Sequence, residues 1–232
     1  MAHSPNTTSQ MTRRAFLSAS LGVAALSLAG CGGSGATSGS ASGSTATAST
    51  FAAATDGPIT EATGDYASGF HGATIEVERY GTIKLQLNGT VAPVTVTNFA
   101  NLAASGFYDG LTFHRIIKGF MIQGGDPKGD GTGGSDRAIV GEFADNGHPN
   151  PISHVRGTIS MARSSAPNSA SSQFFIMQED TPSLDGQYAA FGHVTEGMDV
   201  VDAIADAAKP TDSNGTIAPG EQPKIVSIRM DD

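Results

Sequence analysis

The sequence contains a single cysteine, no tryptophan and few basic residues. With only Cys31 available, no disulfide can form within one chain. The 13 Lys and Arg residues against 22 Asp and Glu residues give a formal net charge of −9. This balance argues against nucleic acid as a partner, because phosphate binding needs a basic surface. The 6 histidines are scattered and none lies near the cysteine, so we expect no metal site and no cofactor.

Aromatic residues are scarce before residue 69, where Ser, Thr, Ala and Gly dominate. Runs such as Gly32-Gly33-Ser34-Gly35 bury too little apolar area to offset the entropy lost on ordering, so residues 31–68 are predicted to be a flexible tether. From Phe70 onward, apolar runs alternate with turn residues, as in a folded domain. The predicted domain, residues 69–232, has about 160 residues, enough to bury a core without disulfides or metals.

The first 30 residues predict an export signal. Arg13-Arg14 precede an apolar stretch over residues 15–29, which is too short to span a bilayer comfortably. The stretch ends in Leu28-Ala29-Gly30-Cys31, which resembles the bacterial lipobox, where the cysteine is lipidated and becomes the first mature residue. The alternative is a buried cysteine on a core helix. We therefore predict a signal peptide over residues 1–30 and a lipid on Cys31 that anchors an extracytoplasmic protein to the bacterial cell membrane.

The export route has two candidates. The run Thr12-Arg13-Arg14-Ala15-Phe16-Leu17 resembles the twin-arginine motif, which carries folded cargo. An ordinary Sec signal can also hold two arginines, and Ser18 stands where a lysine often follows the twin-arginine motif.

The sequence pattern of residues 69–232 predicts many short strands and two helices. Pro93 suits the first turn of a helix and Gly106 is a natural stop, so a helix is expected over residues 93–105. A second helix is expected over residues 199–207. Alternating runs predict strands over residues 74–78, 82–87, 112–117, 120–123, 157–162, 174–178, 190–194 and 224–230. This pattern suggests an all-β fold with two helices closed into an antiparallel barrel, although the pattern alone leaves a sandwich open.

The densest chemistry lies in residues 108–125. In a strand, Phe113, Arg115 and Ile117 would face one side, and His114 and Ile116 the other. The apolar residues that follow, up to the single amide of Gln123, would give an apolar pocket with one fixed cation. The alternative from the residues alone is an exposed arginine over an ordinary core.

Residues 108–125 resemble the signature of the cyclophilin family of peptidyl-prolyl cis-trans isomerases, with each fixed position filled. Further family blocks follow in the family's order, and the resemblance covers residues 72–230. These blocks are Gly131-Thr132-Gly133-Gly134, Gly157-Thr158-Ile159-Ser160-Met161-Ala162, Asn168 with Ser172-Gln173-Phe174-Phe175-Ile176, Leu184-Asp185-Gly186 and Phe191-Gly192.

The resemblance implies a closed antiparallel eight-stranded barrel and an isomerase that accelerates X–Pro rotation without a cofactor. It makes Arg115 the catalytic residue. It implies a proline socket with the walls Phe120, Met121, Phe175 and Leu184. It also implies that the side-chain amides of Gln123 and Gln173 hold the substrate backbone. The main chain at Ala162 and Arg163 would pair with the peptide before proline, and the Tyr188 ring would lie at the pocket edge.

Three positions depart from the best-known eukaryotic members. Ser183 replaces a tryptophan that helps those members bind cyclosporin, so we expect weak inhibition. Tyr188 replaces a histidine and keeps a flat ring with a polar tip, so activity should survive. Arg163 replaces an asparagine, and its side chain would favour acidic neighbours of proline.

The expected role is folding of exported, proline-containing polypeptides by a monomer at the outer face of the membrane. Two alternatives remain. The pocket could hold proline segments of a partner, with catalysis incidental, or the protein could be a lipoprotein chaperone that binds unfolded chains regardless of proline.

Overall fold

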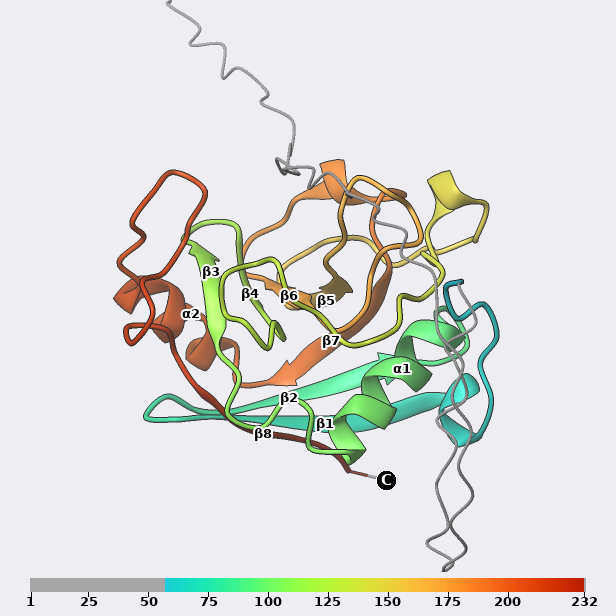
Figure 1. The fold of residues 1–232 in the computed structure, drawn as a ribbon, viewed down its shortest axis with the longest axis horizontal. Helices are drawn as coiled ribbons and strands as arrows, with labels where there is room; N and C mark the ends of the chain where they lie inside the picture. The colour runs from blue at the N-terminus through green and yellow to red at the C-terminus, as the bar shows by residue number, and fades with distance from the viewer. Residues whose placement is uncertain (1–56, 232) are drawn as a thin grey trace, which may run out of the picture. The chain divides into compact units, whose positions relative to one another are not determined.

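The computed structural model describes residues 57–231. The expected signal peptide over residues 1–30, the lipidation site Cys31 and the tether up to residue 56 lie outside the described residues. Within the described part, strands and two α-helices alternate with loops and short 3-10 turns (Figure 1). The expectation of a mostly β domain with two helices is therefore confirmed.

The strands form one antiparallel sheet, drawn as arrows in Figure 1, in the order β3-β4-β6-β5-β7-β2-β1-β8. The expected first hairpin is confirmed, with pairs running from Phe70 opposite Asn88 to Val77 opposite Gly81. The strands are β1 (Phe70–Val77), β2 (Gly81–Asn88), β3 (Phe113–Ile117), β4 (Met121–Gly124), β5 (Thr158–Met161), β6 (Phe174–Met177), β7 (Ala190–Glu196) and β8 (Ile225–Met230).

The expectation of a closed barrel is wrong, because β3 and β8 form the two edges of the sheet. The chain just before β3 reaches β8 through single contacts, such as the bond that the Ile225 amide donates to the Leu111 carbonyl at 2.8 Å. The outer edge of β3 is taken instead by the loop over residues 214–217, where the Gly215 carbonyl accepts a bond from the Ile116 amide at 2.8 Å. Because this loop occupies backbone groups that β8 would need, the sheet stays an open half-barrel.

Both expected helices form. Helix α1 (Pro93–Ala104) starts at its proline and buries Phe99 and Ala103 as the spacing predicted. It packs against β8, whereas α2 (Met198–Ala207) packs against β2 and β4, and the two helices lie on opposite sides of Figure 1.

Helix α1 is capped by a residue distant in sequence. Its N-cap position, Ala92, has no side chain that could bond the free backbone N–H groups of the first turn. The carboxylate of Glu142, itself only 4% exposed, accepts the Val94 amide at 3.0 Å and the Thr95 amide at 2.8 Å. A negative charge at this end also complements the helix dipole. Glu142 therefore ties the loop that contains it to the start of α1.

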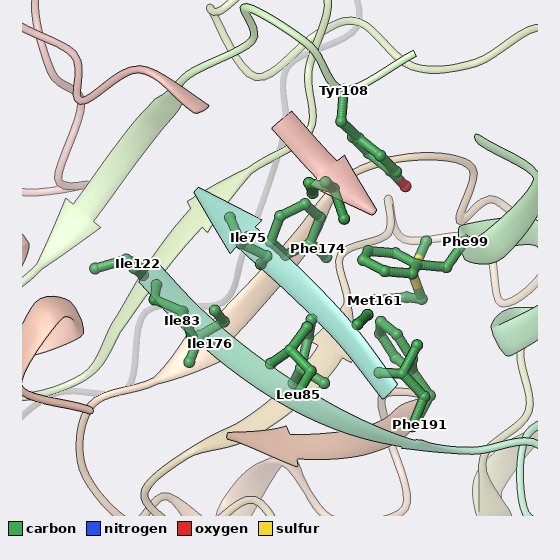
Figure 2. Packing of buried hydrophobic residues seen from close by; sticks show 14 of the residues in the cluster. Ile75, Ile83, Leu85, Phe99, Tyr108, Ile122, Met161, Phe174, Ile176 and Phe191 are labelled. Carbon is green, nitrogen blue, oxygen red and sulfur yellow. The ribbon is translucent and has the colours of Figure 1, made fainter. Parts of the chain in front are cut away.

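The core lies between the sheet and the two helices and contains a cluster of aromatic rings (Figure 2). Phe99 stands at its centre, with ring centroids 5.3 Å from Tyr108, 5.7 Å from Phe174 and 5.4 Å from Phe191. Isoleucine and leucine side chains from β1 and β2 complete the packing. This rigid core supports the short strands that carry the site described next.

The folded part begins earlier than the expected boundary at residue 69. Ile59 donates its amide to the Ala138 carbonyl at 2.8 Å and accepts the Val140 amide at 2.8 Å. A 3-10 turn, η1 (Asp65–Ala67), then packs against α1. Ile59 stands alone among polar residues and forms no alternating strand pattern. Residues 57–68 were therefore predicted to belong to the tether.

Candidate active site

The hairpin of β3 and β4 carries the central cation of the site. A register shift between Phe113 and Arg115 interrupts the pairing of the two strands. Phe113 therefore enters the main core, while Arg115 and Ile117 face the other side. The expectation that Phe113 and Arg115 share a face is wrong, because a bulge reverses the alternation of side chains along a strand.

A second apolar cluster, separate from the core, lies beside this hairpin. Its buried members are Met121, Phe175, Met177 and Leu184, and its half-buried members are Ile117, Phe120, Ala162 and Tyr188. It gathers all four residues expected to form the proline socket. Met177 was missed, although it follows Phe175 by two positions on β6, and alternation would have placed both on one face.

The guanidinium of Arg115 points toward this cluster. Its Nη1 lies 3.9 Å from the Met121 sulfur and donates to Gln123 Oε1 at 3.0 Å. Burial lowers the pKa of Arg115, and nearby Tyr188 and Asp212 partly offset that effect. The side chain stays charged because the ordinary pKa of a guanidinium is about 12 or higher.

A relay of amides fixes the orientation of Gln123. Its Nε2 donates to Gln173 Oε1 at 2.9 Å. Gln173 in turn donates through its own Nε2 to the carbonyl of Gly133 at 2.7 Å and to that of Gly131 at 3.2 Å. Each side-chain oxygen therefore faces toward Arg115, and each NH₂ group faces toward the glycine loop.

The loop over residues 212–216 holds Arg115 from the other side, a contact that the sequence analysis missed. The carbonyl of Asn214 accepts a bond from Arg115 Nε at 2.8 Å. Asp212 shapes this loop by accepting the amides of Asn214 at 2.9 Å and Thr216 at 3.0 Å. The residues around Gly215 are typical of a turn, but a turn pattern does not reveal which side chain its carbonyls bind.

Tyr188 and Arg163 border the cluster on one side. The Tyr188 ring packs edge-on against Phe175 with centroids 5.8 Å apart. The guanidinium of Arg163 lies between two aromatic faces, 4.8 Å from the Tyr188 centroid and 5.0 Å from that of Phe143. Tyr188 therefore connects the apolar cluster to a second cation.

His154 contacts the apolar cluster through Phe175 and is held by hydrogen bonds at both ring nitrogens. Its Nδ1 lies 2.9 Å from Asp185 Oδ1 and its Nε2 lies 3.0 Å from Ser160 Oγ, while its ring stacks on Phe175. Burial lowers the pKa of His154, and Asp185 opposes that shift. A neutral ring suits this geometry, with Nδ1–H donating to the carboxylate and Nε2 accepting from the hydroxyl.

Comparison with known proteins identifies this arrangement. The family model described as cyclophilin type peptidyl-prolyl cis-trans isomerase matches residues 73–230. A peptidyl-prolyl cis-trans isomerase-like protein from Neurospora crassa is 47% identical over 151 residues, covering 65% of this chain and 88% of that one. A peptidyl-prolyl cis-trans isomerase from Synechococcus elongatus is 49% identical over 124 residues, covering 53% of this chain and 80% of its own.

A solved structure agrees with these matches. The crystal structure of a Cryptosporidium parvum cyclophilin type isomerase, determined in the presence of the dipeptide Ala-Pro, superposes with a TM-score of 0.61. It is 34% identical and covers 69% of this chain and 99% of its own. This chain belongs to the cyclophilin-type peptidyl-prolyl cis-trans isomerases.

The three departures from the best-known cyclophilins lie near the site. Ser183 is exposed on the 3-10 turn η3 (Pro182–Leu184), immediately before Leu184 of the apolar cluster. Tyr188 packs on Phe175, and Arg163 packs on Tyr188. These departures therefore alter the border of this cyclophilin's site and leave the Arg115–Gln123 pair and the apolar cluster in place.

Residues 57–231 contain neither a cluster of metal-ligating side chains nor a membrane-spanning helix. No three His, Cys, Asp or Glu side chains in this part gather closely enough to hold a metal ion. Neither of its helices has the length and apolar character needed to cross a bilayer.

Proposed function

We propose that this cyclophilin accelerates rotation about X–Pro bonds in exported polypeptides, while a lipid on Cys31 holds it as a monomer at the outer face of the cell membrane. The observation that carries the catalytic part is the Arg115 guanidinium, which lies 3.9 Å from Met121 and 3.0 Å from Gln123 beside a largely buried apolar cluster. The export part rests on the amino-acid sequence of residues 1–68.

The reaction requires stabilisation of a twisted amide. Rotation about the peptide bond meets a barrier of about 18–20 kcal/mol because twisting removes resonance. No covalent bond breaks, so neither a nucleophile nor a metal is required. An acceleration of about 10⁵ corresponds to about 7 kcal/mol of stabilisation in the transition state relative to the ground state.

Arg115 supplies the charged donor for this step. As the amide twists, its nitrogen becomes pyramidal and basic and can accept a hydrogen bond. The Arg115 guanidinium then donates either to that nitrogen or to the adjacent carbonyl. Partial burial strengthens such a bond, and contacts with Gln123 and Asn214 orient the donor before substrate arrives.

The apolar cluster holds the proline ring, so that the preceding part of the peptide can turn. Phe120, Met121, Phe175 and Leu184 form the walls, and Met177 lies behind them. Gln123 and Gln173 bind the substrate backbone. The main chain at Ala162 and Arg163 pairs with the residues before proline in the manner of an added strand, which tolerates many side chains.

Replacement of Arg115 tests the catalytic assignment. In the full chain purified in detergent, Arg115→Ala should lower kcat/KM on an Ala-Pro peptide by about 10²–10³, the usual effect of losing one preorganised charged donor. The control is Arg229→Ala, which removes a surface arginine paired with Asp109. Wild-type turnover by a folded Arg115→Ala variant would show that Arg115 has been misassigned.

Replacement of Cys31 tests the cellular assignment separately. In a bacterial host, the wild-type full chain should fractionate with membranes, incorporate a labelled fatty acid and be cut by protease added outside the cell membrane. Cys31→Ser should abolish both labelling and membrane retention. Equal labelling of the two proteins, or protection of the wild type inside the cytoplasm, would refute lipid anchoring at the outer face.

A further inference from the structure

Arg163 is a cation held in a fixed position beside the apolar cluster. Its guanidinium lies over the Phe143 ring at 5.0 Å and over the Tyr188 ring at 4.8 Å. Its Nε donates to the Gln187 carbonyl at 2.9 Å and its Nη1 to the Ser164 carbonyl at 2.9 Å. The same Nη1 also donates to the Ser165 carbonyl at 3.4 Å. Two aromatic faces and three neutral acceptors therefore fix the plane of this group before any substrate binds.

The charge of Arg163 is not neutralised by a carboxylate within residues 57–231. Other basic side chains of that part form ion pairs, for example Arg156 with Asp202 and Arg229 with Asp109. Arg163 instead bonds to main-chain carbonyls, and its Nη2 donates to none of the described residues. A guanidinium that keeps one NH₂ group available is suited to bind an anion.

The distance from the socket indicates where that anion would lie. The centroid of Phe175, a wall of the socket, is 5.8 Å from that of Tyr188, and Arg163 lies one ring further out. An extended peptide advances about 3.3–3.6 Å per residue, so its second residue before proline lies about 7 Å from the ring. A glutamate side chain at that position covers the remaining distance to the guanidinium.

We propose that Arg163 makes this site selective for substrates with a carboxylate at the second residue before proline. The inference rests on the proposed function, which lays the peptide before proline along Ala162 and Arg163. The formal net charge of −9 repels acidic peptides at long range, so the overall charge of the protein does not produce this preference. It therefore depends on a local pair, and we expect a preference of about 3–10-fold, at the upper end for a partly exposed ion pair.

If Arg163 had a purely structural role, its replacement would change the rates for all substrates and not the preference among them. The same contacts also join the segment after β5 to Phe143 and Tyr188, and breaking them could deform the site. Deformation would slow every substrate by a similar factor. Selectivity is therefore measured as a ratio of kcat/KM values within each variant, which does not change when all substrates slow equally.

The experiment uses the full chain and three peptides that carry Glu, Gln or Lys two residues before the proline. Wild type should convert the Glu peptide about 3–10-fold faster than the Gln peptide, and added NaCl should reduce that ratio. Arg163→Gln should bring the ratio to about one, and Arg163→Glu should make the Lys peptide the preferred substrate. Arg156→Gln, which removes an equal charge elsewhere, should keep the wild-type ratio.

Three outcomes would overturn the proposal. One is a wild-type Glu-to-Gln ratio near one, with ready turnover of both peptides, and this result leaves the isomerase function intact. Another is a ratio that persists in a folded Arg163→Gln variant or rises with salt. The last is turnover of none of the peptides by wild type, which would refute the isomerase function together with this inference.

Discussion

The loop that holds Arg115 can be displaced by adding one methyl group at Gly215. This glycine has a φ of 88°, a conformation that side chains rarely adopt. A Cβ built there lies 2.5 Å from the Ile117 Cγ1 atom and 2.6 Å from the Ile116 carbonyl oxygen. Since β3 cannot yield without breaking its pairing with β4, Gly215→Ala should move the loop and with it the Asn214 carbonyl.

The expected loss has two parts. The left-handed conformation costs alanine about 1–2 kcal/mol, which lowers stability wherever it occurs. Displacement of Asn214 also removes a hydrogen bond to a charged group, worth about 1.5–3 kcal/mol, from the Arg115 guanidinium. If about half of that energy orients Arg115 in the transition state, kcat/KM should fall about 3–10-fold, since about 1.4 kcal/mol corresponds to a factor of ten.

Gly220→Ala is a matched control for this change. Gly220 has a φ of 89°, and a Cβ built there meets no atom within 4 Å. Both variants should therefore lose stability in urea through the backbone conformation, while only Gly215→Ala loses turnover of an Ala-Pro peptide. Equal kcat/KM values for the two variants would refute the idea that this loop orients Arg115.

Three further predictions concern stability and inhibition. Glu142→Ala should lower the free energy of unfolding by about 2–3 kcal/mol in urea titrations, because the first turn of α1 loses its cap; a loss below about 0.5 kcal/mol would contradict this. Burial lowers the pKa of both His114 and His154 in the folded state, so the unfolded chain takes up protons first as pH falls below about 6.5. Stability should therefore be constant above about pH 7 and decline between about pH 6.5 and 5, by at most about 1.4 kcal/mol per pH unit for each histidine, with a smaller decline in His114→Gln; a flat profile would argue against buried neutral rings. Cyclosporin should bind weakly and gain at least about tenfold in affinity in Ser183→Trp, since a buried aromatic contact adds about 1.5 kcal/mol or more; nanomolar-class binding to wild type would contradict this.

The sequence predicted those parts of the fold that depend on local pattern. The first hairpin and both helices follow from alternation, from Pro93 and from Gly106, and they formed within a few residues of the expected bounds. The signature around Arg115 also placed Met121 and Gln123 correctly beside the cation. These predictions agree with the structure because each depends on residue types at short spacing.

Features that depend on backbone groups far apart in the chain could not be predicted. The Asn214 carbonyl that binds Arg115 is common to every residue type, so nothing in its sequence reveals the contact. The capping of α1 by Glu142 likewise arises only when distant segments meet, and the bulge before Arg115 appears only once β3 has paired with β4. The open sheet has the same origin, because a loop, not a strand, takes the outer edge of β3.

The proposed role of Arg115 as the single charged donor agrees with the neutral partners that surround its guanidinium. Arg115 is held by Asn214 on one side and by Gln123 on the other, and Gln123 is fixed in turn through Gln173 by the carbonyls of the glycine loop. All of these partners are neutral, so they orient the guanidinium without neutralising its charge. A carboxylate in place of either glutamine would hold Arg115 more tightly but would compete with the substrate amide for its protons. An isomerase that works by one hydrogen bond to a twisting nitrogen therefore benefits from amide and carbonyl partners.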